Sequence, residues 1–343
     1  MRHLVLVSDA TATCGVEAFA RLTATHLGAS AEARPLGAPL GDAEDVILNL
    51  PVVAWKKRLL APIIAAAKAR LIGRKVTVIL HEWADLALAR RLSYLPLLPF
   101  ATRILFSSPE IMAQFESTPV SRVLAKARGI VPIPPNFTVP EWTKSTALSQ
   151  SLAGARAVGT FVLGQFGSIY ARKEPGQLLE AAAEMVRRGV DTRVVFVGSF
   201  IKDSTDTEGE FWAEVDRLGL TGRVDVSGYV ASAEEIYGML AEVDAFLYPL
   251  SEGLTSRRGS VQAAALSGRP VIVTAPARSD SLRHHRLLSA LAASVAIQFV
   301  PRDADAAALA DAVLATRGLP VRPVAAAREI AGLWGDVVGI LDA

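Results

Sequence analysis

Apolar and polar residues alternate along this chain in blocks that have the spacing of buried strands and amphipathic helices. Short, nearly continuous apolar runs are typical of parallel strands that are buried on both faces. Such runs fall at residues 3–8, 45–50, 76–80, 103–106, 161–166, 192–197, 224–226, 243–248 and 270–274. Helical spacing falls between them, at residues 16–27, 55–75, 111–116, 175–188, 208–218, 233–241 and 261–266. The alternation predicts an α/β protein built from βαβ units.

The alternation of predicted strands and helices is interrupted once, which predicts two domains. A chain of 343 residues exceeds one hydrophobic core of ordinary size. The polar stretch after Pro134 and Pro135 separates two regions of regular alternation. We expect a first domain over residues 1–140, a linker over 141–158, a second domain over 159–322, and a C-terminal helix within 323–343 that crosses back to the first domain.

A basic loop follows the predicted strand at residues 243–248. It contains Glu252 and then Arg257, Arg258, Gly259 and Ser260, and a helix begins directly after it. Guanidinium groups form forked hydrogen bonds with phosphate, and the free amides at a helix start favour an anion. The loop therefore suits a diphosphate, with Glu252 facing the attached group. A solvated basic loop is the alternative interpretation.

A second loop with the chemistry of an anion site opens the second half of the chain. The predicted strand 161–166 runs into Gly167 and Ser168, and Lys173 precedes a helix that starts at Pro175. Gly167 permits close approach of a ligand to the backbone, and Lys173 can neutralise a phosphate. Lys173 can also be one half of a surface ion pair. Because both loops follow strands of one predicted domain, we favour one shared anion site.

Two places in the first half are candidates for substrate contact. His81 stands directly after the strand 76–80, where a histidine can point into a cleft as a hydrogen-bonding group or a proton carrier. Gly15 and Glu17 lie where the first small-residue loop enters a helix, and they are candidates for contact with a substrate. Structural roles compete in each case. The sequence HEWAD after residue 80 is not the zinc motif H-E-x-x-H, and we assign no metal.

The charge balance excludes some classes of partner. The chain has 36 basic and 34 acidic residues, a net charge of +2, which argues against a general nucleic-acid binder. Its one cysteine excludes an internal disulfide. The short apolar run at the N-terminus does not predict a signal peptide, and no apolar run is long enough to span a membrane. We expect a cytoplasmic protein or one peripheral on the inner face of the membrane.

Residues 55–75 form a basic amphipathic stretch that starts with Trp55. Such a stretch can lie on an anionic membrane. A surface helix whose apolar side packs on a sheet needs the same pattern, and we favour that interpretation. His284 and His285 are expected on a solvated helix or loop, with no acidic partners for a metal.

The order of these motifs resembles that of a GT-B glycosyltransferase of the retaining family-4 type. The resemblance covers nearly the whole chain and rests on a series of short segments in order. These are GVEAFARLTATHL, VILHEW, FGSIYARKEPGQLLEA, VVFVGS, DVSGYV, AFLYPLSEG and SGRPVIVT. It implies two Rossmann-like domains that face each other across a cleft, with a nucleotide sugar bound mostly to the second domain.

The resemblance also implies roles for single residues. His81 matches the cleft histidine near the transferred sugar, Lys173 the lysine that grips the donor phosphate, and Glu252 the first acid of a Glu-x7-Glu motif. The chain departs from the pattern twice. Ser260 stands where the family usually has the second Glu, which contacts the nucleotide ribose, and Ser168 replaces an arginine of the phosphate grip. Arg257 or Arg258 can restore that positive charge.

The function implied is transfer of a hexose from a nucleotide diphosphate to a hydroxyl group, without a metal or another cofactor. The acceptor is a glycan or a lipid-linked sugar in bacterial surface-polysaccharide assembly, and retention of configuration is implied by the resemblance alone. Two alternatives stay open. One is a GT-B sugar-nucleotide epimerase, and the other is an inactive glycosyltransferase that serves as a scaffold in a polysaccharide complex.

Overall fold

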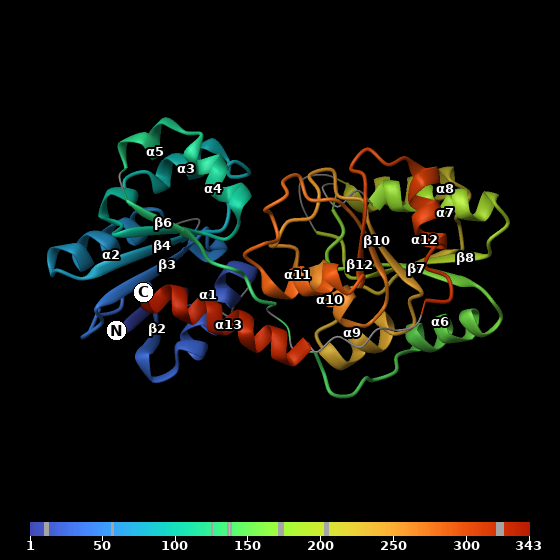
Figure 1. Ribbon diagram of the computed structural model, residues 1–343, viewed down its shortest axis with the longest axis horizontal. Coiled ribbons are helices and arrows are strands. Elements are labelled where there is room, and N and C mark those ends of the chain that lie inside the picture. Colours follow the sequence, from blue (N-terminus) through green and yellow to red (C-terminus); the bar gives the residue numbers. More distant parts are fainter. Residues whose placement is uncertain are drawn as a thin grey trace.

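The chain folds around two parallel β-sheets of six strands each, with helices packed on both faces of each sheet (Figure 1). A computed structural model describes residues 1–9, 14–55, 58–124, 126–135, 137, 139–170, 175–201, 206–319 and 326–343. The predicted α/β class with two sheets is confirmed. In those described residues no helix is long and apolar enough to cross a membrane.

The first sheet has the strand order β2-β1-β3-β4-β5-β6. Its strands are β1 (His3–Val7), β2 (Ala31–Pro35), β3 (Asp45–Leu50), β4 (Lys75–Leu80), β5 (Arg103–Phe106) and β6 (Ala127–Ile130). Its helices are α1 (Gly15–Leu27), α2 (Leu60–Leu71), α3 (Leu88–Tyr94), α4 (Pro109–Glu116) and α5 (Pro119–Val123). Short 3-10 turns are η1 (Gly28–Ser30), η2 (Val53–Trp55) and η3 (Leu98–Phe100). All neighbouring strands of this sheet are parallel.

The second sheet has the order β12-β11-β10-β7-β8-β9. Its strands are β7 (Phe161–Phe166), β8 (Thr192–Val197), β9 (Val224–Val226), β10 (Ala245–Tyr248), β11 (Val271–Thr274) and β12 (Ile297–Val300). Its helices are α6 (Ala147–Ala157), α7 (Pro175–Arg187), α8 (Thr207–Arg217), α9 (Ala233–Leu240), α10 (Gly259–Leu266), α11 (Arg286–Ala293) and α12 (Ala306–Leu314). The stretch 141–158, expected as a linker, contains α6, which begins with a capping box formed by Thr146 and Ser149.

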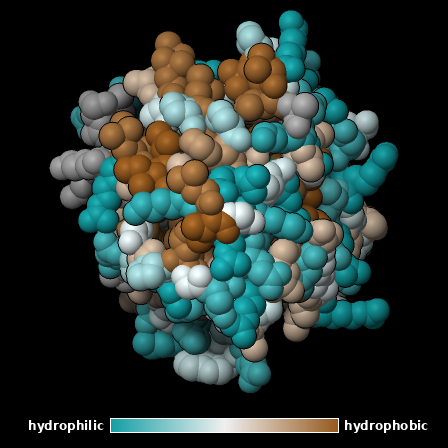
Figure 2. All heavy atoms as spheres, turned by 90° about the vertical axis from the view of Figure 1, so that its left-hand side faces the viewer, coloured by the Kyte–Doolittle hydropathy of each residue, from teal (hydrophilic) through white to brown (hydrophobic). Residues whose placement is uncertain are grey.

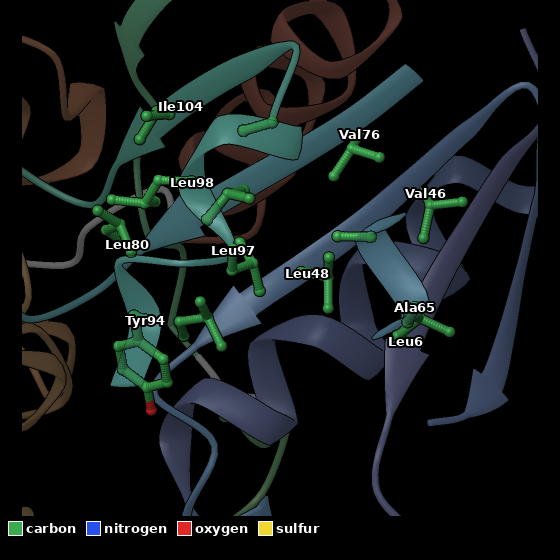
Figure 3. Packing of buried hydrophobic residues seen from close by; sticks show 14 of the residues in the cluster. Leu6, Val46, Leu48, Ala65, Val76, Leu80, Tyr94, Leu97, Leu98 and Ile104 are labelled. Atoms are coloured by element: carbon green, nitrogen blue, oxygen red, sulfur yellow. The ribbon is translucent and has the colours of Figure 1, made fainter. Parts of the chain in front are cut away.

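The core of the first domain lies between the first sheet and the layer that contains α2, α3 and η3. Figure 3 shows Leu48, Val76 and Ile104, from three neighbouring strands, among the side chains packed here. Ala65 of α2 and Leu97 close the same cluster and are almost fully buried. Strands without exposed faces need the continuous apolar runs that the sequence shows.

The last helix, α13 (Ala326–Asp342), packs against α1 in the first domain and against α11 in the second. Its residues Trp334, Val337 and Leu341 are buried in one core with β1 and α1. Near its end, His3 Nε2 lies 2.9 Å from Asp342 Oδ1, and Arg103 donates to the carbonyl oxygen of Ile340 at 2.8 Å. The chain therefore returns to the first sheet after completing the second.

Residues 55–75 differ from the expectation of a helical stretch that Pro62 kinks or splits and whose apolar side packs on the sheet. The helix starts only at Leu60, so Pro62 lies in its first turn, where a missing amide hydrogen is tolerated. The residues of α2 that the sheet buries are small. They are Pro62, Ala65, Ala66 and Ala69. The large apolar residues Leu60, Ile64 and Leu71 are instead exposed to 69%, 51% and 85%.

Candidate functional site

The order of strands in the second sheet marks a point, at the carboxyl ends of two neighbouring strands, where a ligand can bind. In the second sheet the chain leaves β7 toward β8 and β9, then returns to the other side of β7 to form β10. Helices diverge from such a switch point and leave a crevice at the carboxyl ends of the two strands. Gly167 and Ser168 follow β7, and the basic loop with Arg257 follows β10. Both predicted anion-binding loops therefore lie at the switch point.

A cavity of about 890 Å³ opens at this switch point and is lined by both domains. The second domain contributes Gly167, Ser168, Arg257, Arg258, Gly259 and Ser260 from the predicted loops, and the first contributes Gly15 and Glu82. Gly198 and Tyr229, which the sequence did not single out, line it as well. The volume lies within the usual range of small-molecule sites. We call this space the donor cavity.

Arg258 is held at the start of α10, in the wall of the donor cavity. Its Nη1 donates to the hydroxyl oxygen of Tyr170 at 3.1 Å, and its Nη2 forms an ion pair with Glu252. The Glu252 carboxylate is therefore partly neutralised, and it does not belong to the lining of the donor cavity among the described residues. The carbonyl oxygen of Ser260 accepts from Tyr248 Oη at 3.2 Å, which fixes the first turn of α10.

Arg257 joins the two domains. Its Nη1 donates to the carbonyl oxygen of His81, at the end of β4, over 3.1 Å. Its Nε is buried and has no hydrogen-bond partner among the described residues. Arg257 lines both the donor cavity and a neighbouring cavity of about 390 Å³, which also contacts Gly15, Val53 and His81. We call this second space the acceptor-side cavity.

His81 lies in the wall of the acceptor-side cavity but is only 6% exposed. Its Nε2 is 2.9 Å from Asn49 Oδ1, and its ring meets that of Phe19 edge-on. Burial, together with the positive charge of Arg257, lowers the pKa of His81 to about 3. The imidazole is therefore neutral near pH 7, with Nε2 donating to Asn49. A neutral ring can orient a substrate, whereas the low pKa disfavours the role of proton carrier near pH 7.

Gly15 and Glu17 have different positions. Gly15, the first residue of α1, lines both cavities, and the space around its α-carbon is open. Glu17 is 1% exposed and points into the protein, where its Oε1 accepts from Ser8 N at 2.9 Å and pairs with Arg21. It fixes the end of β1 and does not line either cavity among the described residues. Gly15 alone of this pair reaches the substrate space.

Lys173, predicted to grip the donor phosphate, lies outside the described residues. The loop that carries it leaves β7 at Gly167 and Ser168, which do line the donor cavity. In the described part of the chain there is no group of three or more His, Cys, Asp or Glu side chains arranged to hold a metal ion.

His284 and His285 were expected to be solvated, and this expectation was wrong. His285 is fully buried, accepts from Leu288 N with Nδ1 at the start of α11, and donates from Nε2 to the carbonyl oxygen of Ile133. His284 Nε2 is 3.0 Å from Ser256 Oγ, which in turn donates to the carbonyl oxygen of Ser107. These side chains bridge the domains beside the cavities. No pattern in the sequence marks them, because the contact of His285 with Ile133 and that of Ser256 with Ser107 run to backbone groups of the other domain.

The burial of His285 predicts acid-sensitive stability. Burial, partly opposed by the hydrogen bond to Ile133, lowers the pKa of His285 from 6.5 to about 4. The unfolded chain binds this proton below about pH 6.5 and the folded chain does not, so stability falls as the pH drops from about 6.5 toward 4. At pH 5 the loss is about 2 kcal/mol. Denaturant unfolding at pH 7 and pH 5 measures it as the difference between the wild type and a variant without His285, because the low pKa of His81 adds to the wild-type change.

The matched variant is His285→Asn, which keeps a helix-capping side chain but does not titrate. We expect its free energy of unfolding to change about 2 kcal/mol less between pH 7 and pH 5 than that of the wild type. His26→Gln, at an exposed position of α1, is the control and should alter the slope less. Equal pH dependence in the wild type and His285→Asn would contradict the assignment.

Comparisons with known proteins identify a family match for part of the chain and solved structures with a similar fold. Residues 160–316 match the family model described as "Glycosyl transferases group 1". No curated protein sequence matches the chain significantly. Among solved structures, Anabaena Alr3699/HepE in complex with UDP aligns at a TM-score of 0.64 and 14% identity, over 99% of this chain and 94% of that one.

Two further structures align over 99% of this chain and 95% of their own. Sucrose-phosphate synthase from Thermosynechococcus elongatus has a TM-score of 0.60 at 14% identity. WaaG, a glycosyltransferase involved in lipopolysaccharide biosynthesis, has a TM-score of 0.55 at 14% identity. The chain therefore has the two-domain, Rossmann-like GT-B fold, and its residues 160–316 match the group 1 glycosyltransferase family.

Proposed function

We propose that this protein transfers a sugar from a nucleoside diphosphate to an acceptor hydroxyl. The observation that carries the proposal is the pair Arg257 and Arg258, in a cavity of about 890 Å³ between the two domains. Arg257 Nε is buried without a partner among the described residues, and such a group calls for a ligand or an ordered water. The family match over residues 160–316 supports the same chemistry.

The reaction forms a bond between the acceptor oxygen and the anomeric carbon and breaks the bond from that carbon to the donor phosphate. The electron pair of the broken bond goes to the diphosphate, and the hydroxyl proton goes to the departing phosphate oxygen or to water. Negative charge therefore grows on the diphosphate as the bond breaks. Arg257, Arg258 and the amides at the start of α10 stabilise that charge more in the transition state than in the ground state.

The donor diphosphate lies over Gly167, Ser168, Gly259 and Ser260, where the backbone can approach it closely. Lys173 adds a further positive charge from the same loop. The sugar then extends from the donor cavity toward His81 in the acceptor-side cavity. Glu252 acts through its ion pair with Arg258, which sets the position of that guanidinium. Gly15 provides open space for the acceptor beside His81.

The type of sugar, the stereochemical course and the acceptor are inferred from the resemblance and from the solved neighbours. The sugar is a hexose, transfer retains its configuration, and no metal takes part. HepE has been solved with UDP-glucose, which makes UDP-glucose the first donor to test. The acceptor is a glycan or lipid-linked sugar of a bacterial surface polysaccharide, and the reaction takes place in the cytoplasm.

Thermal unfolding with UDP, GDP, ADP and dTDP sugars tests donor binding. A ligand at about 100 times its dissociation constant stabilises the folded state by about 2.7 kcal/mol, so one nucleotide series should raise the unfolding temperature visibly. The shift should not require a divalent metal ion and should shrink in Arg257→Ala. No shift with any series, from well-folded protein, would contradict the proposal.

Two other functions differ from sugar transfer in the step after donor binding. A scaffold is suggested by Ser260, which stands eight residues after Glu252 where the family usually has a second Glu; it would bind donor without releasing nucleoside diphosphate. An epimerase would change the sugar nucleotide without any acceptor. Transfer should instead release nucleoside diphosphate only when an acceptor hydroxyl is present.

A further inference from the structure

Exposed apolar side chains are concentrated on one part of the first domain. Of seventeen large apolar side chains that are exposed in the described residues, nine lie between residues 53 and 123. They are Val53, Leu59, Leu60, Ile64, Leu71, Ile72, Leu88, Leu92 and Val123. The concentration is unusual because single exposed apolar residues normally scatter over a protein surface.

Helix α2 is the centre of this concentration. At about 100° per residue, Leu60, Ile64 and Leu71 lie within about 40° of one another and form a stripe along the helix. The alanine face on the opposite side packs on the sheet. A helix that only covered a sheet would bury its large apolar residues and expose its small or polar ones. In α2 the side chains of Leu60, Ile64 and Leu71 face outward, whereas Ile63 is partly buried against the core.

The same segment is strongly basic. Residues 46–81 contain seven basic residues and no Asp or Glu, although the whole chain carries a net charge of only +2. The seven are Lys56, Lys57, Arg58, Lys68, Arg70, Arg74 and Lys75. Lys68 and Arg70 are exposed and flank the stripe on its two sides. Arg58, which is also exposed, pairs with Asp9 at 3.0 Å.

We define the α2 surface as the apolar residues Leu59, Leu60, Ile64, Leu71 and Ile72 with the basic residues Arg58, Lys68, Arg70 and Lys75. Figure 2 views the first domain from the left-hand side of Figure 1, where α2 lies, and shows brown side chains gathered on this face among teal ones. Helix α3 adds the exposed Leu88 and Leu92, one helical turn apart. Helix α2 and the segment with α3 are successive right-handed connections in one direction along the sheet, so they cover the same face.

We propose that the α2 surface docks this protein on the headgroup layer of an anionic membrane. Outward leucine and isoleucine side chains can enter the boundary between headgroups and acyl chains, and the flanking Lys and Arg groups attract anionic lipids. A second copy of the chain is a poorer partner. A two-fold interface would place the same uncompensated positive charge against itself.

The α2 surface belongs to the domain that supplies most of the lining of the acceptor-side cavity. Val53, which is 44% exposed, lines this cavity together with His81. Leu59 and Leu60 follow a few residues later and begin the exposed stripe. A membrane bound at α2 therefore contacts the domain that lines most of the space assigned to the acceptor. That last step rests on the proposed function and favours a lipid-linked acceptor, whereas docking itself does not depend on sugar transfer.

Sedimentation with vesicles tests docking without donor or acceptor. We expect the protein to bind vesicles of phosphatidylcholine with roughly 30% phosphatidylglycerol, to bind pure phosphatidylcholine far more weakly, and to be released by high salt. Each basic residue near such a surface contributes about fivefold to binding. The double variant Lys68→Gln/Arg70→Gln should therefore bind about 30-fold more weakly.

The triple variant Leu60→Gln/Ile64→Gln/Leu71→Gln should lose at least about 30-fold in binding, because the buried apolar area is gone. Glutamine is a good helix former, so α2 should persist in this variant. The control Trp142→Gln/Val158→Gln/Phe299→Gln changes exposed apolar residues outside the α2 surface and should bind like the wild type.

Several outcomes would overturn the proposal. They are absence of wild-type binding to the anionic vesicles, equal binding by the wild type and the Leu60 triple variant, and equal losses in the triple variant and the control. A dimer in sedimentation velocity that only the triple variant dissociates, without vesicle binding, would assign the surface to a second copy. Donor-induced thermal shifts are measured without vesicles. Membrane docking and sugar transfer can therefore be refuted independently of each other.

Discussion

Replacing Arg258 by alanine should lower kcat/KM for the donor sugar by about 100- to 1000-fold and leave the protein folded. Removal of one preorganised hydrogen-bond donor to a charge that develops in the transition state typically lowers kcat by about 100- to 1000-fold. The loss should appear mainly in kcat, because the diphosphate gains charge as the glycosidic bond breaks. Initial rates with the donor identified by thermal unfolding measure kcat and KM separately.

The partner of Arg258 makes the experiment sharper. Removing the guanidinium leaves the Glu252 carboxylate without its counter-charge near the donor cavity, and it would then repel a diphosphate. The double variant Arg258→Ala/Glu252→Gln should recover part of the lost rate if repulsion contributes. Arg217→Ala removes an arginine that pairs with Glu214 on the surface of α8, and it should change nothing measurable. A kcat/KM for Arg258→Ala within about threefold of the wild type would remove this residue from the mechanism.

Replacing Gly198 by alanine should destabilise the second domain and weaken donor binding. A Cβ atom on Gly198 would lie 2.2 Å from the carbonyl oxygen of Gly167, far inside contact distance. The two backbones are joined there, since Gly167 N donates to Val197 O at 2.9 Å. Neither side can yield without moving the end of β7 or β8. We expect a loss of about 3 kcal/mol and a fall in unfolding temperature of roughly 4 °C for a single cooperative unit of this size.

Gly154→Ala is the matched control in the same domain. Gly154 lies on the exposed side of α6, where an added Cβ meets no atom within 4 Å. Alanine stabilises such a helical position by up to about 1 kcal/mol relative to glycine. If Gly198→Ala unfolded at the same temperature as Gly154→Ala, the close approach of β7 and β8 would not constrain this loop.

Apolar runs predicted the interior strands, whereas among the described edge strands only β9 was predicted with its bounds. The interior strands β3, β5, β7 and β8 were predicted with the bounds that the structure shows, because strands with neighbours on both sides and helices on both faces need unbroken apolar runs. β2 and β12 were missed. Both are edge strands with partly exposed residues, so neither Ala31–Pro35 nor Ile297–Val300 needs such a run.

Periodicity located the helical segment of α2 but not its orientation. Alternation reveals a large apolar face and a small alanine face, and it does not say which of them the sheet accepts. Short side chains let α2 lie close to the sheet, so the alanine face was buried. This choice depends on the depth of the space between sheet and helix, which only the assembled fold defines.

In the candidate site, too, some features could be predicted from the sequence and others could not. Loops that follow neighbouring parallel strands meet at one edge of a sheet, so the positions of Gly167, Ser168 and Arg257 could be predicted from strand order. The hydrogen-bond partners of the site residues could not be predicted from the sequence. Arg257 contacts the His81 carbonyl and His285 contacts the Ile133 carbonyl, and both contacts depend on how two domains meet. A role for Lys173 stays a prediction.

Helix α13 makes the two domains interdependent for folding. Leu333 belongs to the core of the second domain, whereas Trp334, Val337 and Leu341 belong to the core of the first. A protease-resistant fragment that ended near residue 140 would lack three core side chains and would expose the apolar face of α1. Excision of either half therefore removes part of the other half's interior, and the polypeptide should behave as a single cooperative unit despite its two sheets.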